Sequence, residues 1–208
     1  QYRESDFDFA SRLMEEEGIF YFFLHSDGAH KMVVADSPMS HPQLPGNSVI
    51  LFDSMTGGRR EEDRIWQWEK VQELRSGKYT VWDHNFELPQ KHLDASVTTV
   101  DSATAGTVTH KLRVAGNEDF EIYEYPGGYA HRFDGIDPGG SERASDLQKL
   151  FDDNQRTVKI RMQQEEVGTL AIHGLSDCRQ MTSGHKFRLD GHENGDGEYV
   201  LVSVHHEA

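Results

Sequence analysis

The sequence predicts an α+β protein made of antiparallel β-barrel-like modules, an amphipathic N-terminal helix and one long helix. Three observations predict this class. The chain opens with a helical pattern that ends at a glycine and leads directly into an apolar strand, residues 1–24. A second helical pattern covers residues 141–165. Elsewhere short strand patterns alternate with Gly and Pro turns, which favours antiparallel sheets or barrels over a wound parallel sheet.

The opening helix carries clear signals at both ends. Ser5, followed three positions later by Asp8, is a capping-box variant that satisfies free N–H groups of the first turn. Gly18 can adopt the left-handed conformation that closes a helix. Residues 19–24 contain no polar side chain, so we expect protein to cover both faces of this strand. The apolar helix face predicted from the spacing comprises Phe9, Ala10, Leu13 and Met14.

The remaining strands are predicted from alternation and turn residues. Residues 25–28 form a turn, so residues 19–24 and 30–36 are expected to make a hairpin. Residues 64–74 and 79–86 are expected to make another hairpin through Ser76 and Gly77. The other expected strands are 49–52, 108–114, 119–125, 167–175, 185–189 and 199–206, while 90–106 has no assigned element. We expect two modules, residues 1–86 and residues 87–208.

Length and charge limit the classes of function. A chain of 208 residues is long enough to bury a substantial core. Its formal net charge of −15 argues against nucleic acid or an anionic membrane as the partner. Cys178 is the single cysteine, so no intrachain disulfide and no cysteine zinc cage can form. No apolar run approaches the roughly 20 residues that a membrane span needs, and no signal peptide is visible.

The search for reactive groups assigns no catalytic, cofactor-binding or metal-binding residue. His205 and His206 are neighbours on an expected strand, so their rings point to opposite faces, and no His-Glu-x-x-His motif occurs. Cys178 has His173 and His185 nearby in sequence, but a buried structural thiol is favoured over a Cys–His dyad. A carboxylate pair for glycoside hydrolysis stays open as an alternative, although no pair is nominated. We therefore expect a protein that is not an enzyme and needs no cofactor.

Five blocks, in order along the chain, resemble the VgrG family, the spike proteins of the bacterial type VI secretion system, which are related to phage tail-hub proteins. The first is the aromatic-rich helix and strand of residues 1–24, which begins Gln-Tyr-Arg-Glu-Ser-Asp-Phe. The tail also follows the family pattern, with Gly174, Cys178 and Arg179 followed by a final strand that ends in His-His-Glu. The intervening blocks are residues 32–37, 77–89 and 123–129.

The resemblance implies a structural role. It implies a homotrimer whose barrel-like modules form a pseudo-sixfold ring between the Hcp tube and the puncturing needle, with baseplate and effector proteins as further partners. It also implies assembly in the bacterial cytoplasm and export by the type VI machine without a signal peptide. A small-molecule substrate or nucleic acid is not expected. Acidic groups should face solvent rather than subunit contacts, because each copy carries a charge of −15.

The chain also departs from the family pattern. The barrel strands that precede the opening helix in the family, the following oligonucleotide-binding-like domain and the β-helical needle are missing, so we expect a piece of a longer protein. Such a piece should expose apolar surface and self-associate. Two other functions remain open: a phage tail-hub protein of the same fold and, as the less favoured reading, a glycan or cell-wall hydrolase domain.

Overall fold

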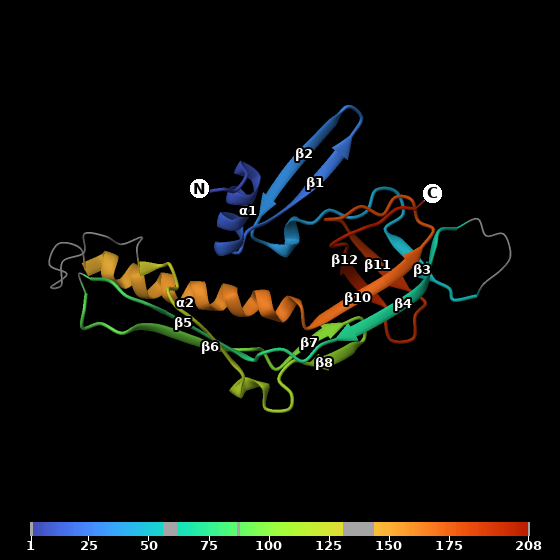
Figure 1. Ribbon diagram of the computed structural model, residues 1–208. Helices are drawn as coiled ribbons and strands as arrows, with labels where there is room; N and C mark the ends of the chain where they lie inside the picture. The colour runs from blue at the N-terminus through green and yellow to red at the C-terminus, as the bar shows by residue number, and fades with distance from the viewer. Residues whose placement is uncertain (1, 56–61, 87, 131–143, 208) are drawn as a thin grey trace. The chain divides into compact units, whose positions relative to one another are not determined.

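The computed structural model describes residues 2–55, 62–86, 88–130 and 144–207, and it confirms the α+β class (Figure 1). The helices are α1 (Asp6–Glu16) and α2 (Ala144–Val167), with short 3-10 turns η1 (Pro38–Ser40) and η2 (Asn117–Asp119). The strands of the first half are β1 (Phe20–Ser26), β2 (Ala29–Ala35), β3 (Val49–Phe52), β4 (Arg64–Gln72), β5 (Lys78–Asp83) and β6 (Leu93–Thr98). The later strands are β7 (Ser102–Ala105), β8 (Val108–Lys111), β9 (Glu121–Glu124), β10 (Leu170–Ser176), β11 (Lys186–Asp190) and β12 (Gly197–Val200).

Within the described residues, the strands form separate sheets. β1 and β2 make a two-stranded hairpin, and β7 and β8 make another. A larger sheet has the strand order β10-β4-β3-β11-β12, and a smaller one has the order β6-β5-β9. Antiparallel pairs are mixed with parallel ones, because β3 runs parallel to both β4 and β11, and β5 runs parallel to β9. The parallel pairs are possible because long connections separate the paired strands along the chain.

Two compact units, each discontinuous in sequence, make up the chain. The first comprises residues 1–71, 103–110 and 171–208, and the second comprises residues 72–102 and 111–170. The sequence instead predicted a single boundary between residues 86 and 87. The difference arises because β10 returns from far along the chain to pair with β4 in the first unit.

The predicted hairpin of residues 64–74 and 79–86 is wrong. β4 belongs to the sheet of the first unit, whereas β5 pairs with β6 and β9 in the second. Gly77 does not reverse the chain. Its N–H donates to the carbonyl oxygen of Asn117 at 2.9 Å, and its own carbonyl oxygen accepts from Thr99 N at 2.8 Å. A Cβ at position 77 would lie 2.8 Å from the Asn117 oxygen, so glycine there permits a close backbone approach.

The local signals of the opening helix are confirmed. Ser5 is the N-cap of α1, and its Oγ accepts a hydrogen bond from the backbone N–H of Asp8 at 3.1 Å. Gly18 has φ = 70° and ends the helical segment as expected. No residue of α1 is buried, although its apolar residues share one face. The helix therefore owes its form to capping and local pattern more than to deep burial.

The core of the second unit lies between α2 and the sheet of β5 and β6. Leu150 and Val158 of the helix are at most 1% exposed and pack with Val81 and Leu93. The spacing of apolar residues in 141–165 predicts one helix face of Ala144, Leu147, Phe151, Val158 and Met162. Val158 and Met162 are buried as predicted, but Phe151 is only partly buried and Leu150 is buried instead. The side chains of Ala144 and Leu147 lie outside the described residues. β6 and β7 occupy residues where the sequence indicated no element.

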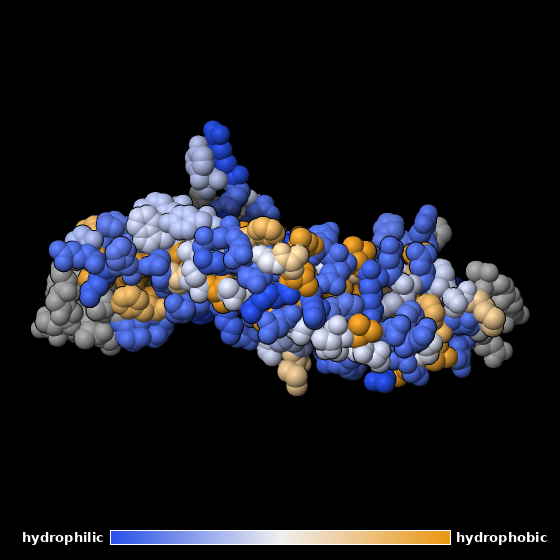
Figure 2. Space-filling model, turned by 90° about the horizontal axis from the view of Figure 1, so that it is seen from below, coloured by the Kyte–Doolittle hydropathy of each residue, from blue (hydrophilic) through white to orange (hydrophobic). Residues whose placement is uncertain are grey.

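The core of the first unit is formed by strands and loop segments that are distant in sequence. Its members are Leu44, Ile50, Ile65, Cys178, Met181, Phe187 and Leu189. Ile50 alternates with Val49 and Leu51, which are 39% and 42% exposed, so β3 is buried on one face. Hydrophilic residues cover most of the molecular face drawn in Figure 2, and hydrophobic residues form small separate patches between them. None of the described helices is long and apolar enough to cross a membrane.

Candidate interaction surface

One face of the β1–β2 hairpin is apolar and open. The register places Tyr21 opposite Val34, Phe23 opposite Met32 and His25 opposite His30. These positions alternate along each strand, so all six side chains share one face, which we call the open hairpin face. The side chain of Phe23 is 37% exposed, that of Met32 37% and that of Val34 53%.

Aromatic contacts order this face and extend it onto the opening helix. The Tyr21 and Phe23 rings meet edge to face with centroids 6.1 Å apart, and Phe23 stacks on His25 at 6.4 Å. Phe7 of α1 meets Tyr21 at 5.5 Å, and Phe7 itself is 51% exposed. Aromatic pairs in these arrangements stabilise one another beyond simple burial. The result is an ordered apolar surface on which Phe7 of α1 contacts Tyr21, while Phe23, Met32 and Val34 stay exposed.

The opposite face of the hairpin packs against the first unit. Phe22 is 5% exposed and lies 5.2 Å from His41 between ring centroids, while Phe20 stacks on His41 at 4.7 Å. His41 Nδ1 donates a hydrogen bond to the carbonyl oxygen of Gly184 at 2.9 Å. The sequence predicted protein on both faces of residues 19–24; within this chain, the side of Phe22 is covered and Phe23 on the other side is exposed. The polar residues of β2 and the exposed turn were the signal that this strand is only half covered.

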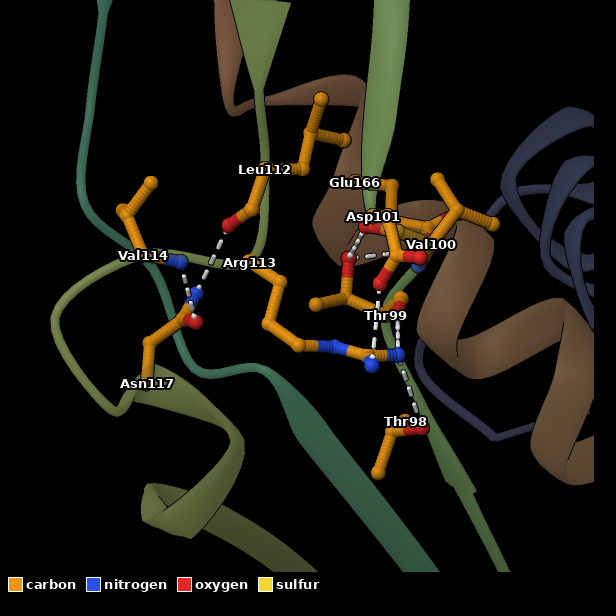
Figure 3. A network of polar contacts seen from close by, with 9 residues as sticks. All are labelled: Thr98, Thr99, Val100, Asp101, Leu112, Arg113, Val114, Asn117 and Glu166. Carbon is orange, nitrogen blue, oxygen red and sulfur yellow. Dashed lines mark hydrogen bonds and ion pairs between the residues drawn. The ribbon is translucent and has the colours of Figure 1, made fainter.

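A polar network in the second unit holds the end of α2 against the sheet (Figure 3). Glu166 Oε1 accepts hydrogen bonds from Thr99 Oγ1 at 3.0 Å and from Val100 N at 2.9 Å. Arg113 donates to the carbonyl oxygen of Thr99 at 2.8 Å and forms an ion pair with Asp101 at 2.9 Å. Asp101 is 81% exposed, so this ion pair contributes little on its own. The hydrogen bonds that Glu166 accepts from the Thr99 hydroxyl and the Val100 N–H fix the segment between β6 and β7.

Asn117 is a buried member of this network. It is 3% exposed, and its Nδ2 donates to the carbonyl oxygens of Leu112 and Arg75, each at 3.0 Å. Its Oδ1 accepts from Val114 N at 3.0 Å. One side chain thereby pairs three backbone groups of two segments far apart in sequence. The sequence analysis missed Asn117, and the Gly-Asn pair at residues 116–117 was the only signal of a turn there.

The residues considered for catalysis are not brought together. Cys178 is 4% exposed, and burial raises the pKa of its thiol, as expected for an unreactive structural cysteine. His185 Nδ1 instead donates to the carbonyl oxygen of Ser183 at 3.3 Å, and the described contacts include no hydrogen bond between Cys178 and His185 or His173. His206 Nε2 donates to the carbonyl oxygen of Met181 at 3.0 Å. In the described ranges, no three His, Cys, Asp or Glu side chains cluster as a metal site would require.

Comparison with known families identifies the fold. The model of the phage tail baseplate hub (GPD) family matches residues 1–208, the whole chain. The chain belongs to the phage tail baseplate hub family. The resemblance seen in the sequence is confirmed by this match and by spike proteins of the VgrG type among its relatives.

Two relatives from Pseudomonas aeruginosa show how much of such a protein the chain represents. It is 31% identical over 206 residues to the type VI secretion system spike protein VgrG1a, covering 98% of this chain and 27% of the relative. It is 29% identical over 206 residues to VgrG1b, covering 98% of this chain and 24% of that relative. The actin cross-linking toxin VgrG1 of Vibrio cholerae is 33% identical over 89 residues, 43% of this chain and 8% of the toxin. The chain thus spans about a quarter of the length of the first two relatives.

Proposed function

We propose that this chain is the hub module of a type VI secretion spike, and that it works by assembly rather than by catalysis. The observation that carries the proposal is the family match over the whole chain, together with the similarity to VgrG spike proteins. In this proposal three copies form the base that joins the Hcp tube to the needle and supports effector delivery. The module assembles in the bacterial cytoplasm and leaves the cell through the type VI machine.

The open hairpin face supports an assembly role, and we infer that another copy of the chain covers the part of this face formed by Tyr21, Phe23, Met32 and Val34. All six of its residues lack a formal charge at pH 7 when histidine is neutral, although charged residues make up 27% of the sequence. Chains of net charge −15 repel one another, so they associate through faces that carry no acidic group. Exposed apolar patches ringed by polar residues commonly mark protein contacts.

A pair of valine substitutions tests this assignment. Val34 is 53% exposed on the open hairpin face, whereas Val202 is 87% exposed in the C-terminal segment. In the parent protein, V34E should convert trimers to monomers in sedimentation experiments, because a buried unpaired carboxylate is costly at an interface. V202E is the matched control and should leave trimers intact. If the V34E protein still forms trimers, the open hairpin face is not the contact between copies.

Export provides the test of the function itself. Deleting the parent gene should abolish release of Hcp into the medium, and the wild-type gene should restore it. If Hcp release continues without the protein while an intact phage tail fails to form, the phage tail-hub alternative is correct. The description of the matched family, which names a phage baseplate, is the observation that favours this alternative.

The proposal also holds that the module catalyses no reaction. It is supported by the buried thiol of Cys178 and by the scattered hydrogen bonds of the histidines to backbone carbonyl groups. The alternative is a glycan or cell-wall hydrolase. Incubating the purified chain with peptidoglycan should release no soluble fragments. Fragment release that stops on replacing one carboxylate would establish the hydrolase instead.

A further inference from the structure

Two histidines face one another at the end of the β1–β2 hairpin. His25 and His30 are directly opposite in the register, and their Nδ1 atoms are 2.7 Å apart. The ring centroids are 4.9 Å apart, and the ring planes are inclined at 73°. Both side chains are exposed, so the pair is accessible to solutes.

The contact between the two Nδ1 atoms defines the protonation of the pair. A hydrogen bond between them requires one Nδ1 to carry the proton and the other to offer its lone pair. A metal ion can take the place of this shared proton, because a neutral imidazole binds metal through either ring nitrogen once its proton is on the other. The pair therefore presents two nitrogen ligands 2.7 Å apart, and a rotation of each imidazole about its side-chain bonds would turn both lone pairs toward one ion beside the line that joins them.

The surroundings of the pair favour a bound cation. Phe23 lies beside the His25 ring with the centroids 6.4 Å apart and an interplanar angle of 23°, and it brings no positive charge near the pair. Lys31 pairs with Leu24 and so belongs to the opposite face of the hairpin, away from the histidines. Asp27 lies in the intervening turn and adds a negative charge nearby. The net charge of −15 attracts cations to the molecule as a whole.

We propose that His25 and His30 form a two-histidine site for a divalent transition-metal ion, with Cu²⁺ bound more tightly than Ni²⁺ or Zn²⁺. With metal–nitrogen bonds of about 2.0 Å, cis ligands of a square-planar ion lie about 2.8 Å apart, whereas tetrahedral ligands lie about 3.3 Å apart. The observed 2.7 Å matches the square-planar value, which Cu²⁺ and Ni²⁺ prefer. The usual order of affinities also places Cu²⁺ first.

The site has two protein ligands and leaves the other positions of the ion to water. Within the described ranges, no third His, Cys, Asp or Glu side chain completes a metal-binding group with this pair. Binding is therefore weaker than at a structural site and depends on both imidazoles acting together. When one of two linked ligands binds the ion, the other is held close to it at a high effective concentration. Losing either ligand removes this advantage, so the affinity for the ion falls by about 10²-fold.

The test is a titration of this chain with Cu²⁺ at pH 7.5 in a buffer that does not bind copper. Electron paramagnetic resonance at substoichiometric Cu²⁺ should show coupling to two imidazole nitrogens. H25N and H30N should each weaken the tightest binding step by about 10²-fold and remove the two-nitrogen signal. H84N is the matched control, because His84 is exposed outside the hairpin, and it should bind as the wild type does.

Further measurements distinguish a loss of metal binding from a loss of folding and from a failure of the proposed spike function. Circular dichroism should show the same folded spectrum for all variants without metal. Lowering the pH to 5 should weaken binding, because imidazoles must be neutral to bind metal. Unchanged tight binding in both H25N and H30N, or coupling to a single nitrogen in the wild type, would overturn the proposal. Trimer formation and Hcp release do not enter this assay, so failure here leaves the spike proposal untouched.

Discussion

Gly184 offers the sharpest test of how the hairpin packs on the first unit. It has φ = 79°, and an added Cβ would lie 2.4 Å from Phe22 Cβ and 2.6 Å from Phe22 Cγ. Phe22 is 5% exposed, so its ring has little room to move aside. G184A therefore combines an unfavourable backbone conformation with a steric clash.

Gly28 separates the two effects. Its φ of 70° is close to that of Gly184, but a Cβ at Gly28 would meet nothing within 4 Å. The left-handed conformation costs a non-glycine residue about 1–2 kcal/mol in both variants. Overpacking against Phe22 adds about 1–3 kcal/mol to G184A alone. G184A should thus lower the free energy of unfolding by about 2–5 kcal/mol, and G28A by about 1–2 kcal/mol.

Urea unfolding of the two variants and the wild type measures this difference. Replacing Phe22 by alanine provides the double-mutant cycle, because the clash disappears when the ring is gone. In the F22A background, G184A should destabilise the protein no more than G28A does. Equal destabilisation by G184A and G28A in the wild-type background would show that Phe22 does not pack against Gly184 as described.

Two further predictions concern the second unit. N117A should lower the free energy of unfolding by about 2–4 kcal/mol, because three backbone groups lose their partner, whereas D119A in the same turn should change it by less than about 0.5 kcal/mol. Equal effects in thermal unfolding would contradict the role of Asn117. Burial raises the pKa of Tyr129, and burial with a hydrogen bond to Glu124 raises that of Tyr79 to about 12. The folded state thus holds these protons more tightly than the unfolded state, so stability is complete below about pH 10 and falls as the pH rises toward 12 and beyond. Urea unfolding at pH 9 and 11 measures the loss of unfolding free energy between these two pH values, and Y129F should reduce this loss. If the loss is the same in Y129F, Tyr129 does not contribute to the pH dependence of stability.

Local features of the fold were predictable from the sequence because they depend on residues close together in the chain. Ser5 and Asp8 predicted the start of α1, and Gly18 predicted its end. The turn at Gly28 predicted the hairpin, and β1 and β2 follow it with the expected pairing. The ordered blocks of the sequence predicted the family, which the match over the whole chain confirms.

Pairings between distant segments were not predictable in the same way. The spacing around Gly77 is that of a hairpin turn, yet Gly77 bonds to Asn117 and Thr99, forty and twenty-two positions away, and β4 and β5 join different sheets. Polar composition concealed β6, although Leu93 and Ala95 alternate inward and are at most 3% exposed. Such pairing depends on which segments meet in space, and a local pattern carries no information about the partner.

The sequence by itself determined the fold class, the charge of −15, the ends of α1 and the family. Only the tertiary structure decided which hairpin face stays open and that His25 and His30 approach to 2.7 Å. The apolar run of residues 19–24 is compatible with protein packed against one face of the strand or against both. Which face is buried depends on His41 and Gly184, which are distant in sequence. Both pack on the Phe22 side of the hairpin, and Phe23 on the other side stays exposed.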